Sequence, residues 1–463
     1  MGHSLQQSEY HGESVNSEDS ALVATITEQA LPLNGTDQDF DAIIEAARGK
    51  SLVLIGESTH GTSEFYRARE RLTRRLISEL GFAGVAVEAD WPDAFAINRH
   101  VWNLQPDQPE QQVLAAFERF PAWLWANREV LEFVRWLARF NRTPARADAG
   151  LRPVGFYGLD LYSLRSSIRA VITYLERVDP PAAVRARERY SCMDHFLQDP
   201  QLYGQKADSG FSRSCEQALA EQLQDMQTRA LQRLEGLGLL ADEHRFHVEQ
   251  NARLVRNAGE YDRAMFRGRP GSWNLRETHM FETLQALRDH LSHQLGEPAA
   301  LVVWAHNSHV GNAEATGMVE RREASLGQMA RQVYGDKALL VGFSTASGEV
   351  TAAAHWDGPA ETMALNPPLP GSHEALFQQV PQEAFLLDLR NGTLAAQLGE
   401  PRVQRSVGVV YRPETERESH YLSSRLPQQF DFLLHFQRTH GIEPLIERTP
   451  ASGELGATWP SGL

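Results

Sequence analysis

The chain has 463 residues, of which 42% are hydrophobic and 23% charged, an ordinary composition for a globular protein with a large core. Its formal net charge of −15 at pH 7 argues against nucleic acid and anionic membrane surfaces as main partners, because their phosphates would be repelled. The sequence shows neither a secretion signal nor a run of about 18 apolar residues that would cross a membrane. We therefore expect a cytoplasmic protein.

The cysteine content predicts no disulfide framework. Cys192 and Cys215 are the two cysteines of the chain, and both fall in a region of helical pattern. A buried, inert thiol is the common state of such a residue. We expect two unpaired thiols, which fits a reducing compartment.

The first part of the chain predicts a β-α-β unit. Residues 1–35 are expected to form a flexible N-terminal tail with one short helix at 21–30. The apolar run 52–55 predicts a buried strand, residues 63–80 have the apolar spacing of an amphipathic helix, and residues 85–88 predict a second buried strand. A strand, a helix and a strand in this order imply that the two strands are parallel.

A long helical segment divides the predicted core into two halves. We expect residues 36–163 and 297–449 to form the halves of the core, 164–296 to form a helical insertion, and 450–463 to form a C-terminal tail. Further strands are expected at 154–159, 300–304, 338–343, 385–389 and 407–411. The predicted fold class is α/β, with a mostly parallel sheet, flanking helices and a large helical insertion.

Carboxylate and imidazole side chains follow several predicted strands at the point where each strand ends. The set comprises Glu57 with His60, Glu88, His306 with His309, and Asp160. In a parallel sheet the carboxyl ends of the strands meet at one edge, where ligands and chemistry collect. We therefore expect these side chains to share one site.

Two kinds of site fit this set of residues. In a metal-free hydrolase, a neutral histidine takes a proton from water and carboxylates orient that water. Alternatively, Glu57, His60, His306 and His309 would be ligands of a metal ion. A purely structural interpretation, with carboxylates paired to arginines, also remains. The helical zinc motif, the nucleophile elbow of serine hydrolases and the glycine-rich nucleotide loops are missing.

Three segments, taken in order, resemble the erythromycin esterase family. They are residues 56–64 (GESTHGTSE), 85–90 (VAVEAD) and 304–309 (WAHNSH), and the blocks at 158–162 (GLDLY) and 272–276 (SWNLR) look like further family blocks. The resemblance spans roughly residues 36–435. It implies an α/β core with a helical insertion, a deep cleft at the carboxyl ends of the strands, and ester hydrolysis that requires no metal.

The resemblance also implies roles for individual residues. His60 matches the general base that activates water, with Glu57 and Glu88 as its carboxylates, and we expect Arg69 and His306 to stabilise the oxyanion. The remaining catalytic candidates are His309, which completes an imidazole pair with His306, and Glu374, which looks like a late family glutamate. The expected substrate-binding residues are Trp91, Asp160, Tyr162, Trp273, Asn274 and Arg276.

We therefore expect a hydrolase of a small-molecule carboxylic ester or lactone that works without a cofactor. A macrolide is one candidate substrate, and its hydrolysis would confer antibiotic resistance. Two alternatives stay open because one site can serve different reactions. One is a metal-dependent hydrolase that uses the Glu and His set. The other is a binding or biosynthetic accessory protein that keeps the cleft but not hydrolysis.

Overall fold

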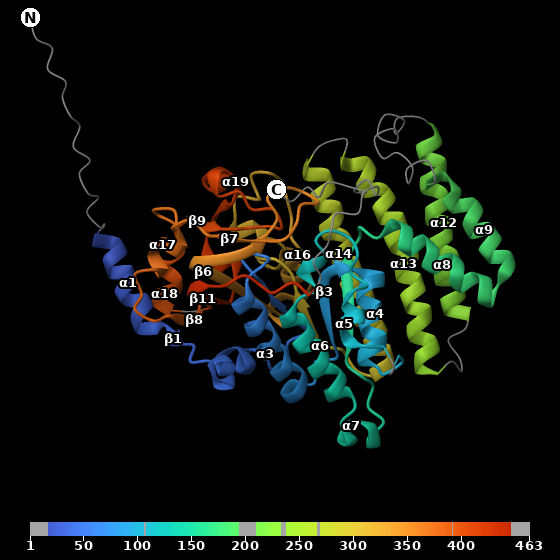
Figure 1. The fold of residues 1–463 in the computed structure, drawn as a ribbon, viewed down its shortest axis with the longest axis horizontal. Coiled ribbons are helices and arrows are strands. Elements are labelled where there is room, and N and C mark those ends of the chain that lie inside the picture. The colour runs from blue at the N-terminus through green and yellow to red at the C-terminus, as the bar shows by residue number, and fades with distance from the viewer. Residues whose placement is uncertain are drawn as a thin grey trace, which may run out of the picture.

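A computed structural model describes residues 17–105, 108–193, 210–232, 238–265, 269–390 and 392–445. An α/β core is built around a mixed, mostly parallel sheet, and a group of long helices stands at one end of it (Figure 1). The strand order is β1-β8-β11-β6-β2-β5-β3-β4, and β7 pairs with β6. The predicted α/β class with flanking helices and a helical insertion is confirmed.

The parallel strands at the centre of the sheet are buried, apart from residues 347–349 of β6. They are β2 (Leu52–Ile55), β5 (Leu301–Trp304), β3 (Gly84–Asp90), β4 (Gly155–Asp160) and β6 (Ala338–Ala352). Leu52 and Leu54 point into one hydrophobic core, whereas Val53 and Ile55 point into the other. Because both faces of the sheet are covered, β2 and β5 are continuous apolar runs rather than alternating ones, and β3 and β6 begin with such runs.

The other side of the sheet contains the strand that the sequence predicted at 385–389, which is β8, and several strands that the sequence pattern did not predict. β11 (Phe432–Thr439) is parallel to β6, and β8 (Ala384–Asp388) is antiparallel to β11. The remaining strands are β7 (Glu361–Ala364) and the separate pair β9 (Arg402–Arg405) and β10 (Tyr421–Ser424). The strand expected at 407–411 is wrong, because Val407 and Val410 form only isolated bridges there.

Helices cover both faces of the sheet. Those that precede β4 are α2 (Asp41–Ala47), α3 (Ser63–Leu80), α4 (Trp91–Val101), α5 (Glu110–Leu114), α6 (Arg128–Asn141) and α7 (Pro144–Asp148). Those that follow β5 are α15 (Asn307–Val310), α16 (Leu326–Tyr334), α17 (His373–Phe377), α18 (Gly392–Gln397), α19 (Glu416–Ser419) and α20 (Leu426–Gln429). The strongly amphipathic α3 turns Phe65, Leu72 and Leu76 into the core that also holds Val53 and Ile55.

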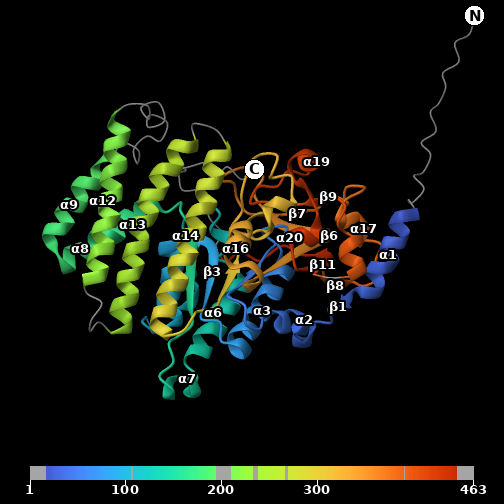
Figure 2. The ribbon, with the colours of Figure 1, turned by 180° about the vertical axis from the view of Figure 1, so that it is seen from behind.

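The segment between β4 and β5 is helical throughout its described part. It contains α8 (Leu164–Val178), α9 (Pro180–Tyr190), α12 (Gly210–Gln232), α13 (Leu239–Met265) and α14 (Arg269–Leu295). In both views α14 lies nearest to the sheet, and α8, α9 and α12 lie farthest from it (Figures 1 and 2). The buried Glu243 of α13 accepts hydrogen bonds from Tyr157 of β4 at 2.7 Å and from Asn98 of α4 at 3.1 Å. These bonds fasten the insertion to the core.

The cysteines correct one expectation from the sequence. Cys192 and Cys215 form a disulfide, with their Cα atoms 5.7 Å apart, that joins the end of the α9 region to α12. The helices fold back on each other and bring together residues that are 23 positions apart. This pairing removes the support that two free thiols gave to a reducing compartment.

Part of the expected N-terminal tail is ordered. Residues 17–29 form α1 (Ser17–Gln29), whose Leu22 and Ile26 are buried, and β1 (Leu31–Pro32) pairs with β8. The tail therefore adds an edge to the sheet instead of hanging free. Residues 1–16 and the expected tail at 450–463 lie outside the described residues. Among the described helices, none is long and apolar enough to span a membrane.

Candidate active site

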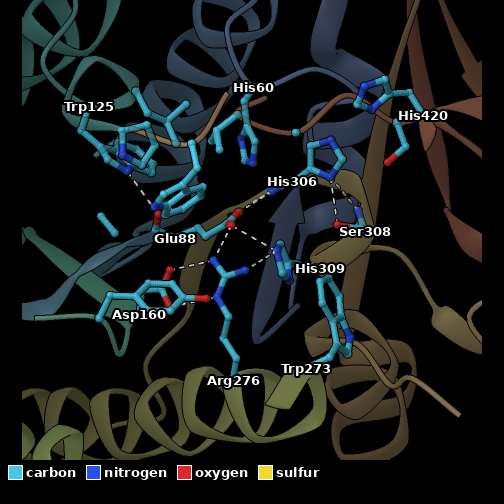
Figure 3. A pocket seen from close by; sticks show the side chains of 18 of the residues that line it. His60, Glu88, Trp125, Asp160, Trp273, Arg276, His306, Ser308, His309 and His420 are labelled. Carbon is cyan, nitrogen blue, oxygen red and sulfur yellow. Dashed lines mark hydrogen bonds and ion pairs between the residues drawn. The ribbon is translucent and has the colours of Figure 1, made fainter. Parts of the chain in front are cut away.

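A cavity of about 490 Å³ lies at the carboxyl ends of β2, β3, β4 and β5 (Figure 3). It brings together most of the residues that the sequence analysis placed in one site. The predicted residues that line it are His60, Glu88, Asp160, Tyr162, Trp273, Arg276, His306 and His309. Glu57 lies directly behind His60, whereas Arg69, Glu374, Trp91 and Asn274 do not line the cavity.

Two glycines allow the loop after β2 to pack tightly. A Cβ atom on Gly56 would lie 2.1 Å from Oδ1 of Asn307, and one on Gly61 would lie 1.7 Å from the carbonyl oxygen of Thr351. Both distances are shorter than any real contact, so a side chain at either position would displace the loop. The close packing fixes the backbone that carries His60.

His60 is held by a buried carboxylate. Its Nδ1 atom is 2.8 Å from Oε1 of Glu57, and Oε2 of Glu57 is 2.7 Å from Nη2 of Arg69. Arg69 also donates from Nε to the carbonyl oxygen of Gly56 at 2.9 Å. The bond between Nδ1 and the carboxylate fixes the orientation of the ring and leaves Nε2 for the cavity.

The position of Arg69 differs from the one that an oxyanion donor needs. Its side chain is 0% exposed, and its guanidinium lies behind Glu57, over the rings of Tyr66 and Trp304. A group so enclosed has no contact with a substrate. The structure therefore corrects the expected role of Arg69, which anchors Glu57 instead.

His306 lies beside His60, with the two ring centroids 4.7 Å apart. Burial and the neighbouring His60 lower the pKa of His306 well below its usual value, so the ring is neutral at pH 7. Its Nδ1 accepts a hydrogen bond from the backbone N–H of Ser308 at 3.3 Å, which places the ring proton on Nε2. Among the described residues, the buried Nε2 has no hydrogen-bond partner of normal geometry. The backbone of Ser58 nevertheless lies near enough to oppose the fall in the pKa of His306.

Glu88 is the anchored anion of the cavity. Oε1 accepts a hydrogen bond from Nη2 of Arg276 at 2.7 Å and lies 3.1 Å from Nε2 of His309. Oε2 accepts the backbone N–H of His306 at 2.9 Å. Burial would raise the pKa of Glu88, but the charges of His309 and Arg276 hold it well below its usual value. Glu88 is therefore ionised.

His309 is a cation between two carboxylates. Its Nε2 faces Glu88 and its Nδ1 pairs with Glu277, while its ring stacks on Trp273 with centroids 4.9 Å apart. Burial alone would lower the pKa of His309, but Glu277 and Glu88 raise it to about 9. An imidazolium donates both of its N–H groups. Nε2 of His309 also lies 3.2 Å from Nη1 of Arg276. Both atoms are then donors, so this contact is not a hydrogen bond.

Arg276 joins two strand ends. It donates from Nε to Oδ1 of Asp160 at 3.0 Å and from Nη2 to Oδ2 at 2.7 Å, in the bidentate geometry typical of arginine and carboxylate. Its guanidinium lies 5.2 Å from the centroid of the Tyr162 ring. Because Arg276 comes from α14, the helical insertion supplies the countercharge for Glu88 and Asp160, which end β3 and β4.

Two of the expected substrate-binding residues are used for packing. The indole N–H of Trp91 donates to His247, with 3.0 Å between Nε1 and Nδ1, and the ring stacks on Tyr157. Asn274 donates from Nδ2 to the carbonyl oxygen of Arg322 at 2.8 Å and accepts the N–H of Ala324 at 2.8 Å. Both side chains therefore hold parts of the protein together, away from the cavity.

Glu374 is also buried away from the cavity. Its Oε1 accepts the backbone N–H of Arg405 at 3.1 Å and the hydroxyl of Ser344 at 3.3 Å. Glu374 therefore acts on the site only indirectly. It holds the backbone of Arg405, and the residue after Arg405, Ser406, lines the cavity. This contact stabilises the segment that forms one wall.

Several residues of the cavity were not identified from the sequence. Arg119 donates from Nε to Oδ2 of Asp90 at 2.8 Å, and its guanidinium lies 4.6 Å from the centroid of the Tyr162 ring. Burial and the charge of Asp90 raise the pKa of Asp93 to about 8. The apolar wall includes Phe117, Leu124, Trp125 and Trp356. These residues come from helices and loops whose sequences carry no sign of a site.

The metal alternative stays a prediction. Within the described ranges, no three His, Cys, Asp or Glu side chains are arranged so that they could hold a metal ion. Of the four expected ligands, Glu57 faces Arg69 and His60, and His309 faces Glu277 and Glu88.

Known proteins share this fold over most of their length. The sequence is 21% identical to YbfO of Bacillus subtilis (strain 168), whose name places it provisionally among the hydrolases, over 88% of each chain. The crystal structure of a succinoglycan biosynthesis protein matches with a TM-score of 0.71 at 21% identity and covers 94% of this chain and 100% of that one. A mutant of the erythromycin esterase EreC in its open conformation matches with a TM-score of 0.63 at 13% identity, over 88% and 95%.

The sequence model of one family covers most of the chain. The erythromycin esterase model matches residues 77–439, a span that includes Glu88, Asp160, Arg276, His306 and His309. Together with YbfO, it supports hydrolase activity at the level of the family. The chain belongs to the erythromycin esterase family.

Proposed function

We propose that the protein hydrolyses a carboxylic ester or lactone and that His60 is the base that activates water. The observation that carries this proposal is the buried bond between His60 Nδ1 and Glu57, with His60 on the cavity wall beside a neutral His306. A base oriented by a carboxylate, next to a neutral hydrogen-bond donor, is what acyl transfer to water requires.

Each step can be assigned to a residue. His60 Nε2 takes a proton from water while Glu57 accepts the N–H of Nδ1, and the water oxygen forms a bond to the ester carbon. The neutral ring of His306, which lines the cavity, would stabilise the oxyanion that develops. The bond from carbon to the leaving oxygen then breaks, and His60 returns its proton to that oxygen. A positioned base of this kind contributes about 10²–10⁴-fold to the rate.

Glu88 would orient the attacking water. Its carboxylate lines the cavity and remains ionised because Arg276 and His309 accompany it. Its fixed acceptors are therefore available to a water molecule near His60. Hydrogen bonds from Arg276, His309 and the backbone of His306 leave the carboxylate little freedom to move.

The cavity fits a substrate with both apolar and polar parts. Its volume of about 490 Å³ is within the usual range for small-molecule sites, and an aromatic wall faces charged residues. The family makes a macrolide lactone one candidate. The shared fold with a succinoglycan biosynthesis protein adds O-acylated sugars as a second class of ester to test.

A substrate panel tests the proposal. The wild-type protein, His60→Ala and the control His440→Ala, which changes an exposed histidine, are incubated with aryl esters, macrolide lactones and O-acetyl sugars. Mass spectrometry then detects addition of one water. We expect the wild type and the control to hydrolyse at least one class, and His60→Ala to lose that activity while remaining folded. Tight binding of a sugar or macrolide without hydrolysis of any ester would instead indicate a non-hydrolytic binding protein.

A further inference from the structure

We propose that Glu277 is a positioning residue of this site, which holds His309 and, through it, the carboxylate of Glu88. Glu277 does not line the cavity, and the cavity residue that its side chain contacts is His309. The inference rests on the proposed function for its kinetic consequences. Its geometric part stands independently of that function.

Glu277 divides its two carboxylate oxygens between two partners. Oε1 pairs with Nδ1 of His309, and Oε2 accepts the backbone N–H of Leu326 at 2.7 Å, where α16 begins. The side chain is 0% exposed. Burying a carboxylate is costly unless it is paired and hydrogen-bonded. The bond to Leu326 fastens α14 to α16, but it accounts for only one of the two oxygens.

The second oxygen completes the fixation of the His309 ring. Trp273 lies four residues before Glu277 on α14, so the two side chains share one face of the helix. Trp273 stacks on the ring with an interplanar angle of 10°, Glu277 meets Nδ1, and Glu88 Oε1 lies 3.1 Å from Nε2. The ring is thereby fixed on its face and on both nitrogens.

Loss of Glu277 would therefore be felt at Glu88. Without a partner for Nδ1, the His309 ring can turn about its side-chain bonds, and Oε1 of Glu88 would keep only Arg276. Glu88 would no longer hold a single orientation toward the water beside His60. Because no substrate contact changes, we expect the effect in kcat rather than in KM.

The protein contains a matched control for this argument. Glu243 is another buried glutamate beside a histidine, with its Oε2 3.0 Å from Nε2 of His290, and it does not line the cavity. Glu277→Met and Glu243→Met each remove a buried carboxylate with hydrogen-bonded partners. Both should lower stability, but only Glu277→Met should change turnover.

The kinetic test uses the aryl ester that the wild type hydrolyses fastest. We expect kcat of Glu277→Met to fall by about 10–100-fold, the loss that is typical when a carboxylate orienting a metal-bound histidine is removed, with KM nearly unchanged. Glu277→Gln, which can still accept from Leu326, should lose less and serves as the test variant if Glu277→Met does not fold. A kcat that matches the Glu243→Met control would overturn the proposal.

A crystal structure of the Glu277 variant gives a readout that does not depend on activity. We expect the contact between Nε2 of His309 and Oε1 of Glu88 to be lost. An unchanged His309–Glu88 contact would overturn the proposal. If no ester is hydrolysed, or if His60→Ala remains active, the proposed function fails, and this structure still decides the role of Glu277.

Discussion

Replacing Glu57 by Gln tests the buried base assembly most informatively, because the change affects stability and activity for different reasons. Glu57 is 2% and Arg69 0% exposed, and they are 2.7 Å apart. Breaking a buried ion pair by removing one partner typically costs about 3–5 kcal/mol, since the other charge is left uncompensated. Glu57→Gln should therefore lower the free energy of unfolding by about that amount.

The double variant Glu57→Gln/Arg69→Met separates the two effects. It removes both charges. The main remaining loss of stability comes from the Gly56 carbonyl, which no longer accepts a hydrogen bond from Nε of Arg69; leaving it unpaired costs about 1–3 kcal/mol. Its loss of stability should thus be smaller than the sum of the two single variants by about 3 kcal/mol or more. Its activity should remain as low as that of Glu57→Gln, because His60 still lacks its carboxylate.

Urea unfolding of the wild type, the two single variants and the double variant gives the stability cycle, and kcat on the same ester gives the activity. Recovery of stability without recovery of activity is the expected result. Strictly additive stabilities would show that the pair is not coupled. A Glu57→Gln enzyme with wild-type kcat would refute the reasoning about His60.

Three further predictions follow from the same structure. Burial would raise the pKa of Glu243, but His290 and Arg152 lower this pKa to about 2. The ionised Glu243 therefore contributes about 3 kcal/mol to the free energy of unfolding. This contribution is present above pH 4.5 and is lost as the pH falls through 2. Acid unfolding of Glu243→Gln should therefore depend less on pH in that range; equal slopes would contradict the assignment. Exhaustive chelation should leave ester hydrolysis unchanged, because Glu57 and His309 already have protein partners. If chelation abolishes the activity and an added metal ion restores it, the metal alternative is favoured. Thiol titration of the unreduced, unfolded protein should find none, because Cys192 and Cys215 are bonded; two reactive thiols would contradict this.

The location of the site was predictable because its residues lie next to strong local patterns. β2 and β5 are short, continuous apolar runs and β3 begins with one, and in a parallel sheet their carboxyl ends meet at one edge. Polar residues near these strand ends, such as Glu88 in the last part of β3 and Glu57 just beyond β2, must therefore come together. The predicted pairing of Glu57 with His60 needed only a turn, because the two residues are three positions apart in one loop.

Residues contributed by helices were harder to identify, because helical spacing does not say which neighbour a face will meet. Glu277 is one residue after Arg276 and looks like any charged residue of an amphipathic helix, yet it is fully buried. Asn274 and Trp91 were expected at the site because of the family resemblance, but each points to another element. Only the packing of α4, α13 and α14 against their neighbours decides these cases.

Long-range pairing explains the remaining differences. β11 has apolar residues at 432–434 but continues through His435 and Gln437, so its pattern is mixed, although it is parallel to β6 in the sheet. Its place depends on a partner about ninety residues away in the chain, which local pattern does not encode. The Cys192–Cys215 bond likewise depends on the fold of the insertion.

The central claim is that His60 activates water for ester hydrolysis. The most direct measurement is the rate of His60→Ala on the ester that the wild type hydrolyses, with and without added imidazole. The account predicts a fall in kcat of about 10²–10⁴-fold, with partial recovery when imidazole occupies the space left by the ring. A folded His60→Ala enzyme that hydrolyses the ester at the wild-type rate would contradict it.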